Sequence, residues 1–297
     1  MIQFKKVRPE DKEIFDSFYQ YKKIKNCETA FANLCAWTFA LNGEYAIIDN
    51  TLVTRVHFEL NKEICYHCPI GEGDRVAIIE KLIKDSQEVG YKMKMMIDCN
   101  DEFKANFCER FSIVEKREYF DYVYLRESLS TLSGKKLQAK RNHVNKFSKT
   151  YDYEYIEINS SNISLCIEFA ERWLIENEKF HPENIEGYKE ELKVIKYFGD
   201  NFDALGLIAG AILVEGTMVA FTLGSKVNNE TFCTHIEKAN TSFDGAYAMI
   251  NKEFSSRLPE QFIYVNREED LGLEGLRKAK LSYQPIELIH KTLATLL

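Results

Sequence analysis

The order of predicted secondary-structure elements occurs twice in this chain, once in each half. Each half is expected to run as a pair of helices, an antiparallel meander, a glycine-containing turn, a helix, a strand, a helix and a final strand. The meanders are expected at residues 44–69 and 205–237, and the final strands at 120–126 and 286–291. No residue-by-residue repeat aligns the halves. A repeat in element order favours two similar domains over one large sheet.

The predicted fold class is therefore α+β, with two mixed, mainly antiparallel sheets flanked by helices. Hydrophobic residues make up 45% and charged residues 29% of the 297 residues, which is typical of a globular chain long enough for two domains. The polar run 127–134 separates the two series of elements. We therefore predict domains at 1–130 and 131–297, with the main site in the second.

The sequence contains no segment typical of membrane insertion or secretion. Its longest apolar run, 204–214, is shorter than the roughly 18–20 residues that span a bilayer. The N-terminus carries no apolar signal core. We expect a cytoplasmic protein without a transmembrane segment. The net charge of −7 argues against general coating of nucleic acid, but a local basic site is compatible with it.

The eight cysteines include one CxxC pair, Cys65 and Cys68. A zinc site would require a second such pair or a downstream Cys/His pair, and the spacing provides neither. Apolar and aromatic neighbours favour a strand over a helix-opening redox motif. We expect structural cysteines and no metal site, and a CxxC metal site is the weakest of three functional hypotheses.

The segment 135–149 is strongly basic, with six Lys or Arg residues and no acid. On a helix, Lys140 and Arg141 lie three and four residues from Leu137, beside its apolar stripe. A base at the border of a buried face suggests a fixed anion. We predict that Lys136, Lys140 and Arg141 bind a phosphate-bearing donor. The alternative is a surface helix whose long basic side chains extend from the stripe into solvent.

Two glycine-containing turns, 69–74 and 237–247, each lie between a meander and a helix. The free N–H groups at a helix start can hold a phosphate when a glycine allows close approach. We predict this role for Gly245, while Glu72 and Asp74 disfavour an anion at the first turn. An ordinary turn without a ligand is the alternative at both places.

Three side chains of the second half are candidates for proton transfer. Glu237 ends a meander strand directly before the Gly245 turn, and we predict that it is the general base. Tyr247 or Tyr283 would protonate the leaving group. The sequence contains no Ser/His/Asp signature, Walker loop or HExxH motif.

The segment 264–285 combines acids, glycines and bases in a short space. Helix capping explains part of this pattern, because acids suit a helix start and bases a helix end. Capping leaves Asn266, Gly272 and Gly275 unexplained. We predict that Asn266 and Gly272 line the donor site, and that this segment and the basic segment form its two walls.

The stretches Leu132-Ser-Gly-Lys-Lys-Leu-Gln-Ala-Lys-Arg-Asn-His-Val-Asn-Lys-Phe147 and Asn266-Arg-Glu-Glu-Asp-Leu-Gly-Leu-Glu-Gly-Leu-Arg-Lys-Ala-Lys280 resemble an uncharacterised bacterial family. This family is grouped with the C-terminal domain of phosphatidylglycerol lysyltransferases, and the resemblance covers nearly the whole chain. Its members are similar to tandem GNAT acyltransferase folds, as are the FemX/FemAB peptidoglycan aminoacyltransferases. The resemblance therefore implies two tandem GNAT-like domains.

The chemistry implied by this resemblance is attack by an amine or hydroxyl on an activated acyl or aminoacyl carbonyl. Characterised relatives take the aminoacyl group from tRNA, and ordinary GNAT enzymes take an acyl group from coenzyme A. Lys278 and Lys280 match the lysine-rich helix near the transferase site of these relatives. The resemblance thus implies that they hold the donor or its carbonyl, which makes Lys280 a third catalytic candidate beside Glu237 and Tyr247.

The leading hypothesis is an acyl- or aminoacyltransferase without a tightly bound cofactor, using CoA or aminoacyl-tRNA as a co-substrate. The alternative is a catalytically silent module that binds a nucleotide, CoA or a tRNA 3′ end in the same cleft. Turnover with any acyl donor separates the two. The sequence does not specify the acyl group, the acceptor or the oligomeric state.

Overall fold

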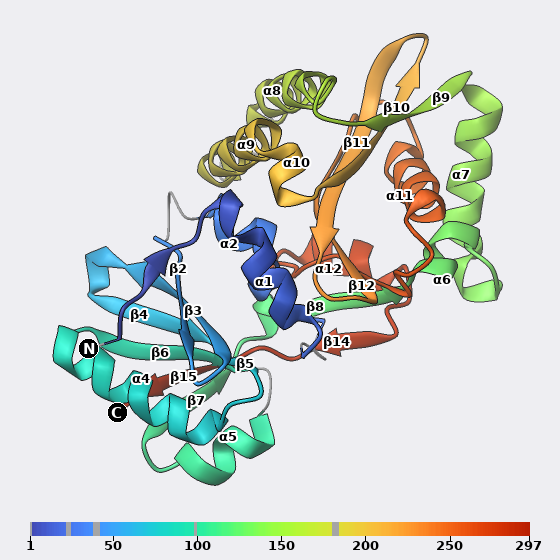
Figure 1. The fold of residues 1–297 in the computed structure, drawn as a ribbon. Helices are drawn as coiled ribbons and strands as arrows, with labels where there is room; N and C mark the ends of the chain where they lie inside the picture. Colours follow the sequence, from blue (N-terminus) through green and yellow to red (C-terminus); the bar gives the residue numbers. More distant parts are fainter. Residues whose placement is uncertain (1, 22–24, 38–41, 98–99, 180–183) are drawn as a thin grey trace.

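The computed structural model describes residues 2–21, 25–37, 42–97, 100–179 and 184–297. Two mixed β-sheets lie next to each other and carry helices on their faces (Figure 1). The first sheet has the strand order β1-β2-β3-β4-β6-β15-β7, and the second has β14-β8-β13-β12-β11-β10-β9. Among the strands of the described residues, only β4 with β6 and β12 with β13 pair in parallel. The predicted α+β class with two mainly antiparallel mixed sheets is confirmed.

The first sheet and its helices come mostly from the first half of the chain. Its strands are β1 (Lys5–Lys6), β2 (Glu44–Ile48), β3 (Thr51–Phe58), β4 (Glu63–His67), β5 (Ile70–Gly71), β6 (Lys92–Ile97), β7 (Phe111–Glu115) and β15 (Thr292–Leu296). Its helices are α1 (Lys12–Tyr19), α2 (Phe31–Ala36), α4 (Arg75–Val89) and α5 (Asn100–Phe107). The β2–β3 hairpin turns at Asp49 and Asn50, whose φ angles of +48° and +56° fit the turn that matches strand twist.

The second sheet is covered by helices on both faces (Figure 1). Its strands are β8 (Asp121–Leu125), β9 (Tyr153–Ile158), β10 (Ile208–Val214), β11 (Thr217–Lys226), β12 (Thr231–Ala239), β13 (Tyr264–Asn266) and β14 (Glu287–Ile289). Its helices are α6 (Arg126–Thr131), α7 (Gln138–Thr150), α8 (Ser164–Glu178), α9 (Ile185–Asp200), α10 (Phe202–Leu205), α11 (Ala246–Arg257) and α12 (Glu274–Leu281). Phe221 packs with α8 and α9, whereas Phe232 packs with α7 and α11. The strands β10, β11 and β12 each contribute buried side chains to both cores.

One hydrophobic core joins the two halves. Phe15 and Phe31, from α1 and α2, lie in the same buried cluster as Phe198 from α9 and Phe221 from β11. Tyr45 of the first sheet also belongs to it. Because these side chains are buried together, the two halves stabilise each other through apolar contact.

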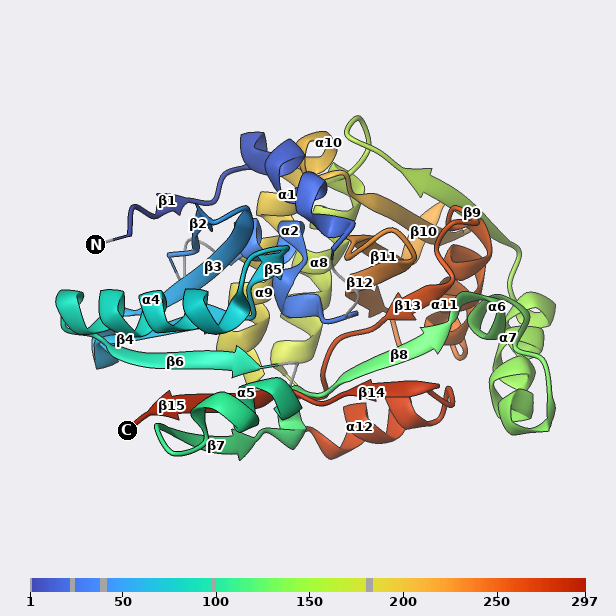
Figure 2. The same ribbon diagram turned by 60° about the horizontal axis from the view of Figure 1, so that its bottom comes forward.

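Two strands lie in the sheet of the opposite half (Figure 2). The strand β15 lies between β6 and β7 and pairs antiparallel with both. The strand β8 lies between β13 and β14 and also pairs antiparallel with both. The two insertions occupy equivalent places in the two strand orders. The halves thus exchange one strand reciprocally.

Because of this strand exchange, two strands predicted from the sequence have a different place in the sheets from the one expected. The predicted strand 120–126 exists as β8, but it belongs to the second sheet, and the first series ends with β7 instead. The predicted strand 286–291 exists as β14, and β15 follows it without having been predicted. Periodicity shows that a segment is extended but does not identify its neighbour. The division into 1–130 and 131–297 stays a prediction, and the sheets exchange strands across it.

An ion-paired carboxylate on β2 gives the first half a pH-dependent stability. Glu44 accepts hydrogen bonds from Arg55 Nε at 2.8 Å and from His57 Nε2 at 2.9 Å. Burial opposes its charged form, but the bonds from His57 and Arg55 outweigh burial and lower the pKa of Glu44. A lowered pKa stabilises the fold above the unfolded value of about 4.3 and loses this contribution as pH falls through the folded value.

We expect Glu44→Gln to lower the free energy of unfolding by about 1.5–3 kcal/mol at pH 7, because hydrogen bonds to a charged group are lost. The difference from wild type should shrink as the pH falls below about 4. Urea unfolding at a series of pH values measures it. Glu260→Gln, at an exposed position, is the matched control and should change stability by less than about 0.5 kcal/mol. An equal loss for Glu44→Gln at all pH values would contradict this origin.

Candidate functional site

The strands β12 and β13 pair only over a short stretch and then separate. Their parallel register ends with Cys233 opposite Asn266. The strand β13 stops there, whereas β12 continues to Ala239. Side chains of the separating segments meet those of α7, α11 and the loop after α12. We name this group the fork site and define it by five residues: Lys140, Glu237, Asn251, Arg267 and Tyr283.

The fork site is held by an ion pair between the two separating strands. Arg267 Nη2 lies 2.7 Å from Glu237 Oε1, and the two side chains are 11% and 12% exposed. Asn251 Nδ2, from α11, donates to Glu237 Oε2 at 3.2 Å. The predicted base Glu237 is therefore anchored and nearly buried. Each carboxylate oxygen can accept two hydrogen bonds, so Glu237 retains capacity for a ligand.

The basic helix and the segment 264–285 meet at one aromatic ring. Lys140 Nζ lies 4.3 Å from the centre of the Tyr283 ring, and the Arg267 guanidinium carbon lies 4.7 Å from it. Burial and the neighbouring Arg267 lower the pKa of the Lys140 ammonium. Two cations on one ring in a half-buried setting make this position attractive to an anion. Contact between the two segments is thus observed, although their role as walls of a site stays a prediction.

Two polar atoms of the fork site are buried and have no hydrogen-bond partner among the described residues. They are Asn251 Oδ1, an acceptor, and Arg267 Nη1, a donor. Asn251 as a whole is only 3% exposed. An unsatisfied buried polar group costs about 1–3 kcal/mol, so native proteins contain few of them. A ligand that offers one donor and one acceptor would satisfy both atoms.

Both tyrosine candidates keep their protons at neutral pH. Burial raises the pKa of Tyr283 to about 12. Tyr247 is 37% exposed as a residue, yet burial of its hydroxyl, with the nearby Glu237 charge, raises its pKa to about 12. Either hydroxyl can therefore act as a proton donor and neither as a base. Of the two, Tyr283 directly contacts other members of the fork site.

The backbone around Gly245 is shaped by helix packing. Its φ of +92° favours glycine, and a Cβ atom there would lie 2.6 Å from the carbonyl oxygen of His143 in α7. Close approach of α7 to the start of α11 therefore requires this glycine. Asp244 lies beside it and accepts from Lys146 Nζ at 2.6 Å. The predicted phosphate contact of Gly245 stays a prediction.

The other predicted donor-binding bases differ in their exposure and in their hydrogen bonds. Lys136 and Lys278 are exposed. Arg141 donates to the carbonyl oxygens of Leu132 and Gly134, the latter at 2.7 Å, and so holds the loop before α7. Its guanidinium is engaged with protein carbonyls before any donor arrives.

Asn266, Gly272 and Lys280 tie the segment 264–285 to its surroundings. Asn266 is buried and donates to Asp121 Oδ2 at 2.8 Å. Gly272 lies in a turn with a φ of +75°, and its backbone N–H donates to Asp270 Oδ1 at 2.9 Å. Lys280 Nζ donates to the backbone carbonyl of Arg267 at 2.5 Å and to the backbone carbonyl of Glu269. These hydrogen bonds within the protein give Asn266, Gly272 and Lys280 a structural role. Direct contact of the three residues with a donor stays a prediction.

A buried ionic cluster at the junction of the halves was not predicted from the sequence. Lys291, between β14 and β15, is fully buried, and its Nζ lies 2.7 Å from Asp121 Oδ1 and 2.9 Å from Glu28 Oε1. Burial alone would lower the pKa of Lys291, but Asp121, Cys27 and Glu28 outweigh burial and raise it. These residues lie far apart in the sequence. Only Asp121, an acid within an apolar strand, gave a local signal.

Two groups of described residues offer atoms suited to a metal ion, and the sequence predicted neither. One comprises Cys27, Asp121 and Glu269, and the other Cys233, His235 and Glu268. The Lys291 ammonium already lies against the first group. The predicted structural pair Cys65 and Cys68 is buried in and directly after β4.

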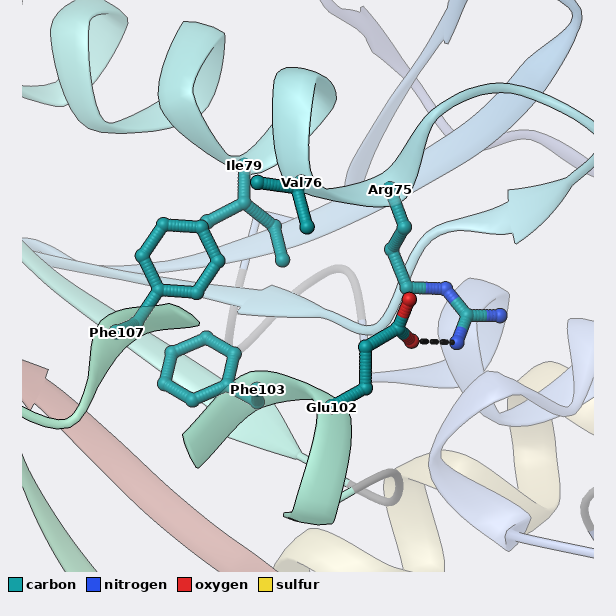
Figure 3. A pocket seen from close by; sticks show the side chains of 6 residues that line it. All are labelled: Arg75, Val76, Ile79, Glu102, Phe103 and Phe107. Atoms are coloured by element: carbon teal, nitrogen blue, oxygen red, sulfur yellow. Dashed lines mark hydrogen bonds and ion pairs between the residues drawn. The ribbon is translucent and has the colours of Figure 1, made fainter. Parts of the chain in front are cut away.

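A small recess between α4 and α5 carries no functional features (Figure 3). It has room for about one water molecule. An ion pair of 2.8 Å between Arg75 and Glu102 lies at its edge. The remaining lining is apolar and comprises Val76, Ile79, Phe103 and Phe107. Among the described helices, none is both long and apolar enough to cross a membrane.

Comparison with known proteins confirms the family resemblance. Residues 19–295 match the family described as "Phosphatidylglycerol lysyltransferase, C-terminal". An uncharacterized protein of Mycoplasmoides gallisepticum (strain R(low / passage 15 / clone 2)), MYCGA3080, is 26% identical over 177 residues. This match covers 58% of the present chain and 55% of the relative, so it spans about half of that curated protein.

Solved structures confirm the tandem GNAT-like fold. A conserved protein of unknown function from Bacteroides thetaiotaomicron VPI-5482 is 44% identical, with a TM-score of 0.94 over 100% of both chains. L-PGS from Bacillus licheniformis is 13% identical, with a TM-score of 0.67 over 98% of this chain and 92% of that one. A tandem GNAT protein from the clavulanic acid biosynthesis pathway is 8% identical, with a TM-score of 0.56 over 99% and 98%. The last two likenesses show the fold alone.

Proposed function

Because the chain belongs to the family of phosphatidylglycerol lysyltransferase C-terminal domains, we propose that it is an aminoacyltransferase. The proposed donor is aminoacyl-tRNA, and the acceptor is an amine or a hydroxyl. The family description names lysyl transfer to a lipid for its namesakes, and general aminoacyl transfer is the part that we carry to this chain. Acyl-CoA is the alternative donor.

The pair of unpartnered atoms in the fork site supports an aminoacyl group. Such a group carries an α-ammonium that donates hydrogen bonds and an ester carbonyl that accepts them. Asn251 Oδ1 would accept from the ammonium, and Arg267 Nη1 would donate to the carbonyl oxygen. Glu237 would add a negative charge beside the ammonium. A plain acyl thioester offers only the carbonyl and would leave Asn251 Oδ1 unsatisfied.

The proposed reaction forms one bond and breaks one. The acceptor nitrogen or oxygen bonds to the carbonyl carbon, and the bond from that carbon to the ribose oxygen breaks. Glu237 takes the acceptor proton and later releases it to solvent, while Tyr283 or Tyr247 gives a proton to the ribose oxygen and regains one from solvent. Arg267 Nη1 stabilises the developing oxyanion. In net terms, one proton passes from the acceptor to the tRNA.

The remaining predicted residues fall into two proposed roles. Lys136, Lys140 and Lys278 would attract the phosphates of the tRNA end, and Lys140 is the one of the three that belongs to the fork site. The Gly245 turn would lie beside the same phosphates. Four residues would instead act as positioning residues that fix the segments carrying the fork site: Arg141, Asn266, Gly272 and Lys280. The polar groups of these residues already form hydrogen bonds within the protein.

A binding experiment with charged and uncharged tRNA tests the donor. We expect aminoacyl-tRNA to bind about tenfold or more tightly than the same tRNA without its amino acid, because the aminoacyl group satisfies two buried atoms. Asn251→Leu should abolish this preference, and Asn106→Leu on the exposed side of α5 should preserve it. Equal affinity for charged and uncharged tRNA would contradict the proposal.

Turnover separates an enzyme from a silent binding module. Labelled aminoacyl-tRNA is incubated with the protein and a panel of acceptors that includes phosphatidylglycerol vesicles and small amines. Faster loss of label from tRNA, with the label recovered on the acceptor, supports transfer. Binding without transfer to any acceptor favours the module. Transfer from labelled acetyl-CoA, but not from aminoacyl-tRNA, would overturn the proposed donor.

A further inference from the structure

Three metal-binding side chains converge where β12 and β13 begin to separate. Cys233 Sγ lies 3.6 Å and His235 Nδ1 lies 2.9 Å from the same oxygen, Glu268 Oε1. One ligand atom from each residue lies within 4.8 Å of the other two. The His235 side chain is 2% exposed and that of Glu268 is 23% exposed. The group is therefore nearly closed, and Glu268 is its most exposed member.

Local backbone irregularities bring these side chains together. The register of β11 and β12 shifts so that Leu223 pairs with Ile236 and Gly224 with Thr234. His235 is thus the extra residue of a β-bulge, a feature that re-aims side chains near functional sites. Glu268 has a φ of +55°, a left-handed conformation that is rare for this residue type. Strained backbone of this kind often marks a functional site.

We propose that Cys233, His235 and Glu268 bind a Zn²⁺ ion, with the fourth position open to water. Zinc prefers tetrahedral coordination by thiolate, imidazole and carboxylate, at about 2.0–2.3 Å from the ion. Ligand atoms at these distances lie about 3.3–3.6 Å apart. The observed separations of 2.9 and 3.6 Å are close to this spacing. Three protein ligands and an open position are typical of a zinc ion that binds a further molecule.

Neighbouring groups hold two of the ligands in place. Ser225 Oγ lies 2.8 Å from His235 Nε2, the ring nitrogen that would not touch the ion. Its hydroxyl can accept the Nε2–H that forms when Nδ1 binds metal, as is usual for metal-bound histidine. Asn33 Nδ2 donates to Glu268 Oε1 at 2.8 Å and fixes the carboxylate.

The charges around the group favour a cation. Glu28, Asp121 and Glu269 lie in the adjoining ionic cluster and share the buried Lys291. Glu268 adds a further acid beside them, and the ammonium groups of Lys280 and Lys291 lie near these acids. Zinc binding would release the Cys233 thiol proton to solvent and move the imidazole proton of His235 to Nε2. The bound ion would add positive charge beside these acids.

Cobalt titration tests the site directly. Metal-free protein, prepared by dialysis against a chelator, is titrated with Co²⁺, which takes zinc sites and absorbs light. We expect one Co²⁺ per chain, a thiolate-to-cobalt charge-transfer band in the near ultraviolet, and displacement of the band by Zn²⁺. Cys233→Ser should abolish the band, and Cys108→Ser, at an exposed cysteine, should leave it unchanged.

Two further variants test the zinc site independently if Cys233→Ser does not fold. Glu268→Gln should weaken Zn²⁺ binding at least about 100-fold, and Ser225→Ala about 10- to 100-fold, by competition with a chromophoric chelator. Circular dichroism checks that each variant is folded. Absence of stoichiometric Co²⁺ binding would overturn the proposal. A charge-transfer band that depends on Cys27 and not on Cys233 would overturn it as well.

Discussion

Glu237→Gln is expected to lower the rate constant of aminoacyl transfer by about 10²- to 10⁴-fold, the usual contribution of a positioned general base. Glutamine keeps the shape of glutamate and can still accept from Asn251, but it cannot take a proton from the acceptor. Its amide also removes the charge that pairs with Arg267 at 2.7 Å. Binding of the tRNA phosphates should change little, because the basic side chains that meet them remain.

Single-turnover kinetics with saturating aminoacyl-tRNA measure this effect on the chemical step. Glu186→Gln is the matched control, because its side chain is 82% exposed. The rate constant should fall steeply for Glu237→Gln while the dissociation constant for uncharged tRNA changes less than about tenfold. An unchanged rate constant would show that Glu237 only anchors Arg267. Rescue of the rate at higher pH would show that the acceptor can lose its proton without a protein base.

Lys291→Met is expected to lower the free energy of unfolding by about 3–5 kcal/mol, which is the second large effect. The ammonium is fully buried between Asp121 and Glu28, at 2.7 and 2.9 Å. Methionine fills a similar space but leaves the buried Asp121 carboxylate, and the partly exposed Glu28 carboxylate beside it, without this counter-charge. Because β8 carries Asp121, the strand exchanged into the second sheet should be affected as well.

Chemical unfolding with a double-mutant cycle measures the second effect. Asp121→Asn in the Lys291→Met background should recover part of the loss, because it removes one uncompensated charge. Lys278→Met, at an exposed position, is the control and should change stability by less than about 0.5 kcal/mol. A loss below about 1 kcal/mol for Lys291→Met would mean that water reaches the carboxylates in the folded protein.

Much of the fold could be predicted because its signals are local. The strand at 153–158 and the helix at 274–281 follow from alternation, helical spacing and glycine turns within short windows. The partners of β8 and β15 could not be predicted, because strand pairing depends on contacts between distant segments. Lys291 illustrates the limit. In the sequence it is a lysine at a strand end, and only the exchange of β15 places it in the core.

The residues of the candidate site could be predicted only where they follow a local sequence pattern. Glu237 and Lys140 could be selected because an acid at a strand end and a base beside an apolar stripe are local patterns. Asn251 reads as an ordinary polar residue in the middle of a helix, and its unpartnered oxygen is visible only in three dimensions. Cys233 and His235 have the spacing of ligands on one strand. Their third partner, Glu268, comes from a distant loop, so no local pattern groups the three residues.

The position of β15 has a consequence for protein synthesis. The strand is made after every other strand in the described part of the chain, yet it fills the space between β6 and β7. About 180 residues separate β7 from β15, which at roughly 5–20 residues per second corresponds to about 10–35 s of translation. During that time the first half presents two unpaired strand edges, a state prone to aggregation. A nascent chain of this protein therefore has a defined interval in which a chaperone would protect it, and a ribosome that stalls before β15 leaves a product that cannot close its first sheet.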